Sequence, residues 1–113
     1  MNVLTEQNTD TAVVDKEQIM KPSQYDVVVY NNDHTSYEEV MVILSNAFEM
    51  THDEALNVAN KVHLEGRGKC GTYSKEVAEM KVVLVSTIKE TLVQMLPDRA
   101  REIRMLNFKI EKA

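Results

Sequence analysis

The stretch YDVVVYNND at residues 25–33 decides how this chain can fold. Its valines and tyrosines predict a short buried strand over residues 25–30, because β-branched and aromatic side chains pack well on a pleated surface. Residues 31–34 are Asn, Asn, Asp and His, which favour a loop. A buried strand that ends in a polar loop therefore opens the folded part of the chain.

Two helices are predicted to follow this loop. Thr35 and Glu38 have the spacing of a capping box, in which the side chain of each residue binds the backbone N–H of the other, and so do Thr51 and Glu54. Gly66 and Gly68 are predicted to end the second helix, because glycine tolerates the left-handed conformation of a helix end. Apolar residues recur at helical spacing after each start. They are Val40, Met41, Leu44 and Phe48 in the first helix and Ala55, Val58, Ala59 and Val62 in the second.

The second half of the chain predicts a strand, a third helix and a final strand. The strand covers residues 69–73, and Ser74 caps a long helix that Pro97 ends. Residues 106–111 alternate between apolar and polar side chains, as in a half-buried strand. The apolar stripe of the long helix is predicted to consist of Val77, Met80, Leu84, Ile88 and Met95.

Together these elements predict an α+β fold, with a small three-stranded antiparallel sheet packed against three helices in the order β-α-α-β-α-β. The folded domain is predicted to cover residues 24–113. Residues 1–23 are polar and lack an apolar pattern. Because burial cannot then offset the entropy lost on ordering, we expect them to form a flexible, disordered tail.

Composition and charge exclude several classes of protein. The 113 residues include 18 acidic and 13 basic side chains, and the formal net charge of −5 gives no basic footprint for nucleic acid. No apolar run approaches the roughly 18 residues of a membrane span, and acidic residues stand where a signal peptide would need an apolar run. The single cysteine, Cys70, cannot form an intrachain disulfide. We expect a cytoplasmic protein that binds neither nucleic acid nor membrane, with a monomer as the simplest state.

The sequence indicates no catalytic or metal chemistry. No pattern assigns a histidine base to Cys70, and a lone cysteine is usually a small apolar residue. His34, His52 and His63 lack the spacing of metal ligands, and one cysteine cannot complete a typical structural zinc site. We therefore expect neither an enzyme nor a cofactor.

Three spaced segments resemble the motifs of one protein family. They are YDVVVYNNDHT at residues 25–35, VHLEGRGKCG at residues 62–71 and EVAEMK at residues 76–81. In this order they resemble the motifs of the ClpS family, the adaptors of the ATP-dependent Clp protease. The resemblance covers about residues 23 to 113, and three motifs in the family order are far more specific than any one of them.

This resemblance implies a site for an N-degron, a polypeptide whose first residue is bulky and apolar. Asn31, Asp33 and His63 match the family residues that hold the free α-amino group. Without the resemblance they would be interpreted as a polar turn and one structural histidine. The resemblance also implies a pocket for the side chain of the first residue. Its walls would be Asn32, Thr35, Tyr37, Val40, Val62 and Leu106.

The resemblance further implies a protein partner. Family members dock on the N-terminal domain of a ClpA- or ClpC-type unfoldase, and Glu76 and Lys81 match that surface. The tail at residues 1–23 matches the segment that takes part in delivery. The implied function is thus a non-enzymatic adaptor that delivers N-degron proteins to the Clp protease. The alternative is a ClpS-like decoy or inhibitor that occupies the unfoldase without delivering substrates. An unrelated α+β interaction domain, such as that of the ribosomal stalk protein, is disfavoured by the polar set at the predicted site.

The chain departs from the family pattern in four places. Asn32 stands where many members have Asp, which removes a charge beside the ammonium group. Tyr37 stands where many have Met, at the gate of the pocket, and Ala59 where some have a larger apolar residue. The region around residues 93–104 is longer, which predicts either an extended third helix or a loop. The accepted first residues stay open, with Phe, Tyr, Trp and Leu implied by the family.

Overall fold

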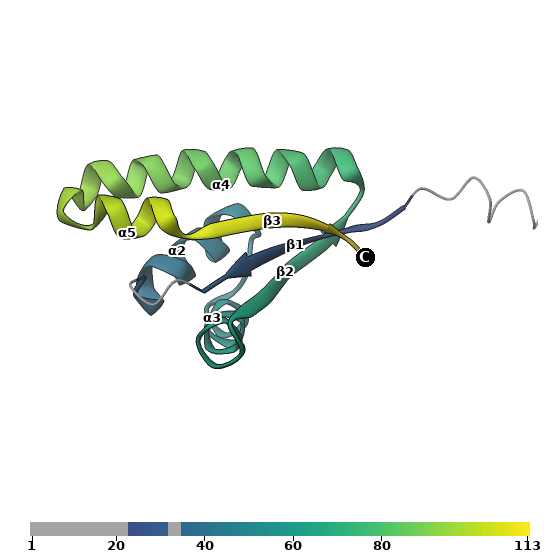
Figure 1. The fold of residues 1–113 in the computed structure, drawn as a ribbon, viewed down its shortest axis with the longest axis horizontal. Helices are drawn as coiled ribbons and strands as arrows, with labels where there is room; N and C mark the ends of the chain where they lie inside the picture. The colour runs from purple at the N-terminus through teal and green to yellow at the C-terminus, as the bar shows by residue number, and fades with distance from the viewer. Residues whose placement is uncertain (1–22, 32–34) are drawn as a thin grey trace, which may run out of the picture.

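The computed structural model describes residues 23–31 and 35–113, so the predicted tail lies outside the described residues apart from its end. Within them, β1 (Tyr25–Tyr30), β2 (Arg67–Tyr73) and β3 (Asn107–Lys112) form an antiparallel sheet in the order β2-β1-β3. The strand predicted first is therefore the central one (Figure 1). Its three valines are fully buried: Val27 and Val29 point to the face that holds the main core, and Val28 points to the opposite face.

The helices pack against this sheet and against one another. Helix α4 contacts all three strands and α2, while α3 packs on α2 and β2. In Figure 1, α4 runs along the top of the molecule and α3 lies at its lower edge, beside β2. The helical elements are α2 (Tyr37–Ala47), α3 (His52–Glu65), α4 (Lys75–Met95), the short 3-10 helix η1 (Pro97–Arg99) and α5 (Ala100–Met105). The α+β class, the antiparallel sheet and the element order are confirmed.

The number of helices differs from the prediction of three, because the longer region near the C-terminus forms the additional helix α5. Pro97 has no N–H to continue α4 and starts η1 instead. The chain then turns back as α5, which Ile103 anchors by burying its whole side chain in the core. This region is therefore neither a simple extension of the third helix nor a loop.

The start of α2 lies one residue later than predicted. Ser36 is the N-cap, and Ser36 and Glu39 form the capping box. The predicted pair, Thr35 and Glu38, does not. The hydroxyl group of Thr35 donates instead to the carbonyl of Glu102 in α5, at 3.3 Å.

β2 begins at Arg67, two residues before its predicted start, and therefore includes Gly68, while β3 covers Asn107–Lys112 rather than residues 106–111. Three other predicted helix boundaries are confirmed. Thr51 and Glu54 form the second capping box, Gly66 ends α3 with φ of 86°, and Ser74 caps α4.

The buried face of α4 is a different one from the predicted stripe. Four of the five predicted residues, Val77, Met80, Leu84 and Met95, are exposed. The helix instead buries Ala78, Val85, Leu92 and Val93. Residues seven apart share a helix face, so the small Ala78 begins a second stripe that a search for large side chains overlooks. Val77, Met80, Leu84 and Met95 consequently face outward.

Three further observations concern function. No helix in the described part of the chain is long and apolar enough to cross a membrane. The described residues also hold no group of three or more His, Cys, Asp or Glu side chains that could bind a metal ion. Burial raises the pKa of the Cys70 thiol to about 12, which keeps the thiol protonated and unreactive at neutral pH.

Candidate functional site

A small pocket lies where the end of β1, the start of α2 and the end of α3 meet. The backbone N–H of Asn31 donates to the carbonyl of Gly66 at 2.9 Å, which ties the end of the strand to the end of α3. His63 lies in the last turn of α3 and is thereby brought to the end of β1. The lining residues are Asn31, Thr35, Ser36, Tyr37, Val40, Ala59, Val62 and His63.

The pocket is apolar at its base and polar at its edge. Val40, Ala59 and Val62 are nearly fully buried and belong to the main core, so the pocket wall is continuous with the packed interior. Asn31 and His63 are exposed. This arrangement suits a ligand with an apolar group and an adjacent polar group, because each part meets the surface that matches it.

Tyr37 and His63 face each other across the pocket. Their ring centroids are 5.4 Å apart and the ring planes are tilted by 60°, a geometry that favours ring contact. The space left among the lining residues is about 20 Å³, which is close to the room that one water molecule needs. A Leu or Phe side chain can therefore enter only if a lining side chain moves. The half-buried Tyr37 ring and the exposed His63 ring, which contact each other, both have an exposed side.

The structure brings together most of the predicted binding residues that it describes. Leu106 is not among the lining residues: it is buried in the core and lines a separate cavity beside α4. Asn32 and Asp33 lie outside the described residues. Ser36 also lines the pocket, although it was not predicted to do so. Its capping-box spacing to Glu39 was the sequence signal that could have placed it at the start of α2. The lining residues that were predicted are Asn31, Thr35, Tyr37, Val40, Val62 and His63.

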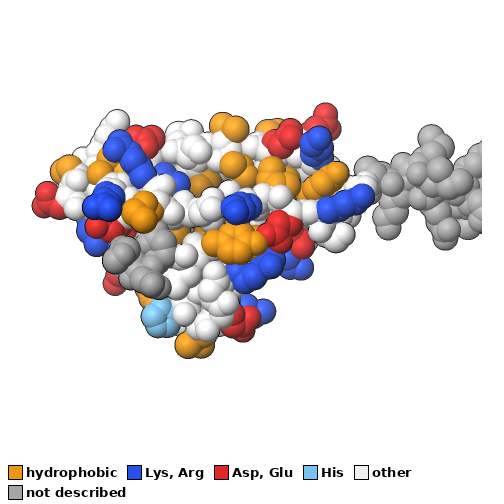
Figure 2. Space-filling model, in the orientation of Figure 1, with side chains coloured by type: hydrophobic (Ala, Val, Ile, Leu, Met, Phe, Trp, Pro, Cys, Tyr) orange, Lys and Arg blue, Asp and Glu red, His pale blue; other side chains and the backbone are white. Residues whose placement is uncertain are grey.

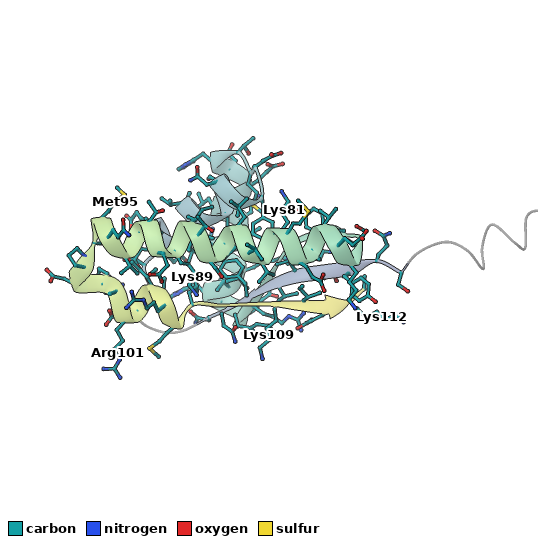
Figure 3. All side chains as sticks on the ribbon, turned by 90° about the horizontal axis from the view of Figure 1, so that it is seen from above. Lys81, Lys89, Met95, Arg101, Lys109 and Lys112 are labelled. Carbon is teal, nitrogen blue, oxygen red and sulfur yellow. The ribbon has the colours of Figure 1, made fainter. Side chains whose placement is uncertain are left out.

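The two residues predicted to bind an unfoldase, Glu76 and Lys81, lie in different environments on α4. Glu76 is exposed in the first turn of α4. The ammonium group of Lys81 instead donates to the carbonyl of Ala47 at 3.0 Å and lies over the rings of Phe48 and Tyr73. Figure 3 shows Lys81 leaving the side of α4 that is opposite to β3.

Glu76 borders a groove on the outer side of α4. The groove has a volume of about 480 Å³ and is lined by Glu76, Glu79, Met80, Val83, Leu84 and Thr87. Met80 is 68% exposed and Val83 is 66% exposed. Apolar side chains are visible at the surface over α4 in Figure 2. Neighbouring exposed apolar residues of this kind are typical of a surface that binds another protein.

The fold, the pocket and the groove together define a small α+β binding domain. The family model for the ATP-dependent Clp protease adaptor protein ClpS matches residues 20–97, which is more than half of the chain. A ClpS adapter protein from Nitratidesulfovibrio vulgaris is 41% identical over 76 residues, covering 67% of this chain and 76% of that protein. One from Cupriavidus metallidurans is 41% identical over 83 residues, covering 73% of this chain and 77% of that protein. This chain belongs to the ClpS family of Clp protease adaptors, which are not enzymes.

A solved structure supports the same assignment. Agrobacterium tumefaciens ClpS2 bound to L-phenylalaninamide is 25% identical to this chain and superposes with a TM-score of 0.66. The match covers 82% of this chain and 100% of ClpS2. The family predicted from the three sequence motifs is therefore confirmed.

Proposed function

We propose that this chain binds N-degron proteins in the pocket between β1, α2 and α3 and delivers them to a ClpA- or ClpC-type unfoldase in the cytoplasm. The observation that carries the proposal is the meeting of Asn31 and His63 with an apolar base in one pocket. The ligand of ClpS2, L-phenylalaninamide, combines a free α-amino group with an apolar ring. Such a molecule matches both halves of this pocket.

The polar edge would recognise the α-amino group. An ammonium group has three donors and a positive charge, and Asn31 offers an amide oxygen while a neutral His63 offers a ring nitrogen. The predicted third acceptor, Asp33, lies outside the described residues. Hydrogen bonds to a charged group contribute about 1.5–3 kcal/mol each. An internal peptide nitrogen has one hydrogen and no charge, so this edge would select the first residue of a chain.

The apolar base would hold the side chain of the first residue. Burying a Leu- or Phe-sized group on Val40, Ala59 and Val62 contributes about 1.5–3 kcal/mol. Moving the Tyr37 ring aside offsets part of this free energy, because the apparent affinity is reduced when only a fraction of the molecules has an open pocket. With the polar contacts, roughly −8 kcal/mol corresponds to micromolar binding, which lets an adaptor release its substrate. Thr35 would contribute to the wall, and the buried Leu106 would support it from the core.

The groove on α4 would hold the N-terminal domain of the unfoldase. Its apolar residues Met80, Val83 and Leu84 offer area, and Glu76 and Glu79 give it an acidic rim that fits a basic partner surface. Lys81 would act from beside the groove, because its ammonium group is engaged at the end of α2. We expect the adaptor to act as a monomer, with residues 1–23 taking part in delivery.

A peptide-binding measurement tests the pocket. A fluorescent peptide that begins with Leu or Phe is expected to bind, and the same peptide with an acetylated α-amino group is not. His63→Ala should abolish binding without changing the fold. His52→Ala is the matched control, because His52 is an exposed histidine at the other end of α3. Peptide binding that survives in His63→Ala would show that the site lies elsewhere.

The decoy alternative is favoured by one observation, the narrowness of the pocket at about 20 Å³. The two functions differ in one outcome. A chain that binds the unfoldase domain but none of the Leu, Phe, Tyr or Trp peptides is a decoy rather than an adaptor for N-degrons.

A further inference from the structure

The segment formed by η1 and α5, residues 97–105, begins where the match to the family model ends, at residue 97. It follows α4 and leads into β3, and Figure 1 shows α5 lying beneath the end of α4. Its contacts are not confined to these neighbours. Two of its residues reach the start of α2, which forms one wall of the candidate pocket.

The first contact is a two-pronged ion pair. The guanidinium group of Arg99 donates to both carboxylate oxygens of Glu39, with Nε–Oε2 at 2.8 Å and Nη2–Oε1 at 3.1 Å. The Glu39 side chain is only 6% exposed, and its Oε1 also accepts from the backbone N–H of Ser36. One buried carboxylate thus joins η1 to the capping box of α2. A bidentate Arg–carboxylate pair fixes orientation as well as distance.

The second contact lies one turn further along the segment. The hydroxyl group of Thr35 donates to the carbonyl of Glu102 in α5 at 3.3 Å. Ile103 beside it is fully buried, which anchors α5 in the core. Thr35 and Ser36 both line the pocket, and Tyr37 follows them directly. The segment therefore holds the consecutive residues that carry the Tyr37 ring.

We propose that residues 97–105 are a brace for the pocket, in which Arg99 acts through Glu39 to hold the first turn of α2 so that the Tyr37 ring lies over His63. Arg99 is a positioning residue and does not touch the ligand. Since the ring narrows the pocket, the brace sets which first residues fit. This consequence for ligand choice rests on the function proposed above, whereas the position of the ring does not.

The same segment offers a matched control. Arg104 of α5 makes an equally two-pronged pair with Glu90, at 3.2 and 3.1 Å. This pair joins α5 to α4 and not to α2, and both side chains are more than half exposed, at 57% and 56%. Arg104→Gln removes the same chemistry from the same segment without touching the wall of the pocket.

The first measurement needs no ligand. In NMR spectra of the free protein, Arg99→Gln should shift the ring signals of Tyr37 and His63, because the contact between these rings loosens. Arg104→Gln should leave them in place, and Arg99→Lys, which keeps one charged donor, should shift them less than Arg99→Gln. Unchanged ring signals in a folded Arg99→Gln protein overturn the brace. If Arg99→Gln does not fold, Glu39→Gln breaks the same pair while keeping the side-chain shape, and unchanged signals there have the same meaning.

The second measurement reports ligand choice. With peptides that begin with Leu and Trp, we expect the ratio of the two dissociation constants to change by roughly tenfold in Arg99→Gln, equivalent to about 1.4 kcal/mol, and to stay constant in Arg104→Gln. If the unmodified protein binds no peptide with a free α-amino group, the proposed function fails while the ring signals still decide on the brace. If the unmodified protein binds the peptides and Arg99→Gln shows the same ratio of dissociation constants for Leu and Trp, the brace does not control selectivity and the proposal is wrong.

Discussion

The pocket and the groove on α4 are opposite kinds of binding surface. The pocket has about 20 Å³ of space, and its apolar residues are part of the core. The groove has about 480 Å³, and its apolar residues stand out on an exposed helix face. A narrow pocket can distinguish single side chains, whereas an open face offers area for a protein surface. Under the proposed function, this difference means that one small domain separates substrate choice from docking, so changes at one surface should leave the other intact.

The largest effect is expected from a charge placed in the groove. Met80→Asp should weaken binding of the unfoldase domain by roughly 100-fold, about 2.7 kcal/mol, because a central apolar contact is replaced by a charge that must lose its water. Peptide binding should not change. Calorimetry with both partners measures the two affinities.

A similar charge outside the groove serves as the control. Val42→Asp alters an exposed apolar residue of α2, on another surface, and should not weaken unfoldase binding. Equal losses for Met80→Asp and Val42→Asp would show that the groove is not the docking surface.

The same substitution, valine to alanine, can be made at each surface to compare how much the two valines contribute to the free energy of unfolding. Val62→Ala should lower the free energy of unfolding by about 2 kcal/mol, from about 0.8 kcal/mol per lost methylene group plus the cavity left behind. Val83→Ala, on the exposed face, should change it by less than about 0.5 kcal/mol. Urea denaturation provides both values. If the two variants lose the same stability, Val83 is packed rather than available to a partner.

Tyr37 decides how narrow the pocket is. Tyr37→Ala should strengthen binding of a peptide that begins with Trp relative to one that begins with Leu, by roughly tenfold or about 1.4 kcal/mol. The reason is that no tyrosine ring then has to move aside for the larger side chain. Tyr37→Phe keeps the ring and should keep the wild-type preference. Fluorescence titrations measure the ratio, and a changed preference in Tyr37→Phe would assign selectivity to the hydroxyl group instead.

The smallest effect is the acid dependence of the brace. The hydrogen bonds from Arg99 lower the pKa of the Glu39 carboxyl below its usual value. The pair therefore contributes its full stability above the unfolded-state pKa, about 4.3 for Glu, and loses it as pH falls through the lower folded-state pKa. The difference in unfolding free energy between the wild type and Arg99→Gln should shrink as the pH falls from 5 toward 2. Denaturation curves across this range measure it, and a difference independent of pH would mean that Glu39 is not the group involved.

Local chemistry accounts for what the sequence predicted well. The valines of β1 have one favourable environment, a central strand, and Gly66 has the φ of 86° that other residues rarely adopt. Most pocket residues of the described chain were predicted through the family motifs, since Asn31 and His63 alone resemble a polar turn and a structural histidine. Their ligand-binding roles stay a prediction.

The features that the sequence did not predict depend on distant contacts. Helix α4 has apolar residues on two faces, and only the packing against the strands and α2 determines that Ala78 and Val85 are buried while Met80 is exposed. The capping box forms at Ser36, while the hydroxyl group of Thr35 binds the carbonyl of Glu102, 67 positions away. The brace itself joins residues 60 positions apart. No local pattern records contacts of this range.

The hydrogen bond from Asn31 to Gly66 has a consequence for how this site can evolve. It joins two backbone atoms, so among exchanges of the Asn31 side chain only proline removes the donor, and Gly66 carries the further requirement of a positive φ. A backbone contact thus fixes the distance between the end of β1 and the end of α3, which carries His63. The wall at residues 35–37 depends instead on side-chain contacts, from Arg99 to Glu39 and from Thr35 to the carbonyl of Glu102, and both contacts involve a segment outside the family match. Under the proposed function, mutations in this segment would change the range of accepted first residues over generations while the edge formed by Asn31 and His63 stays where it is.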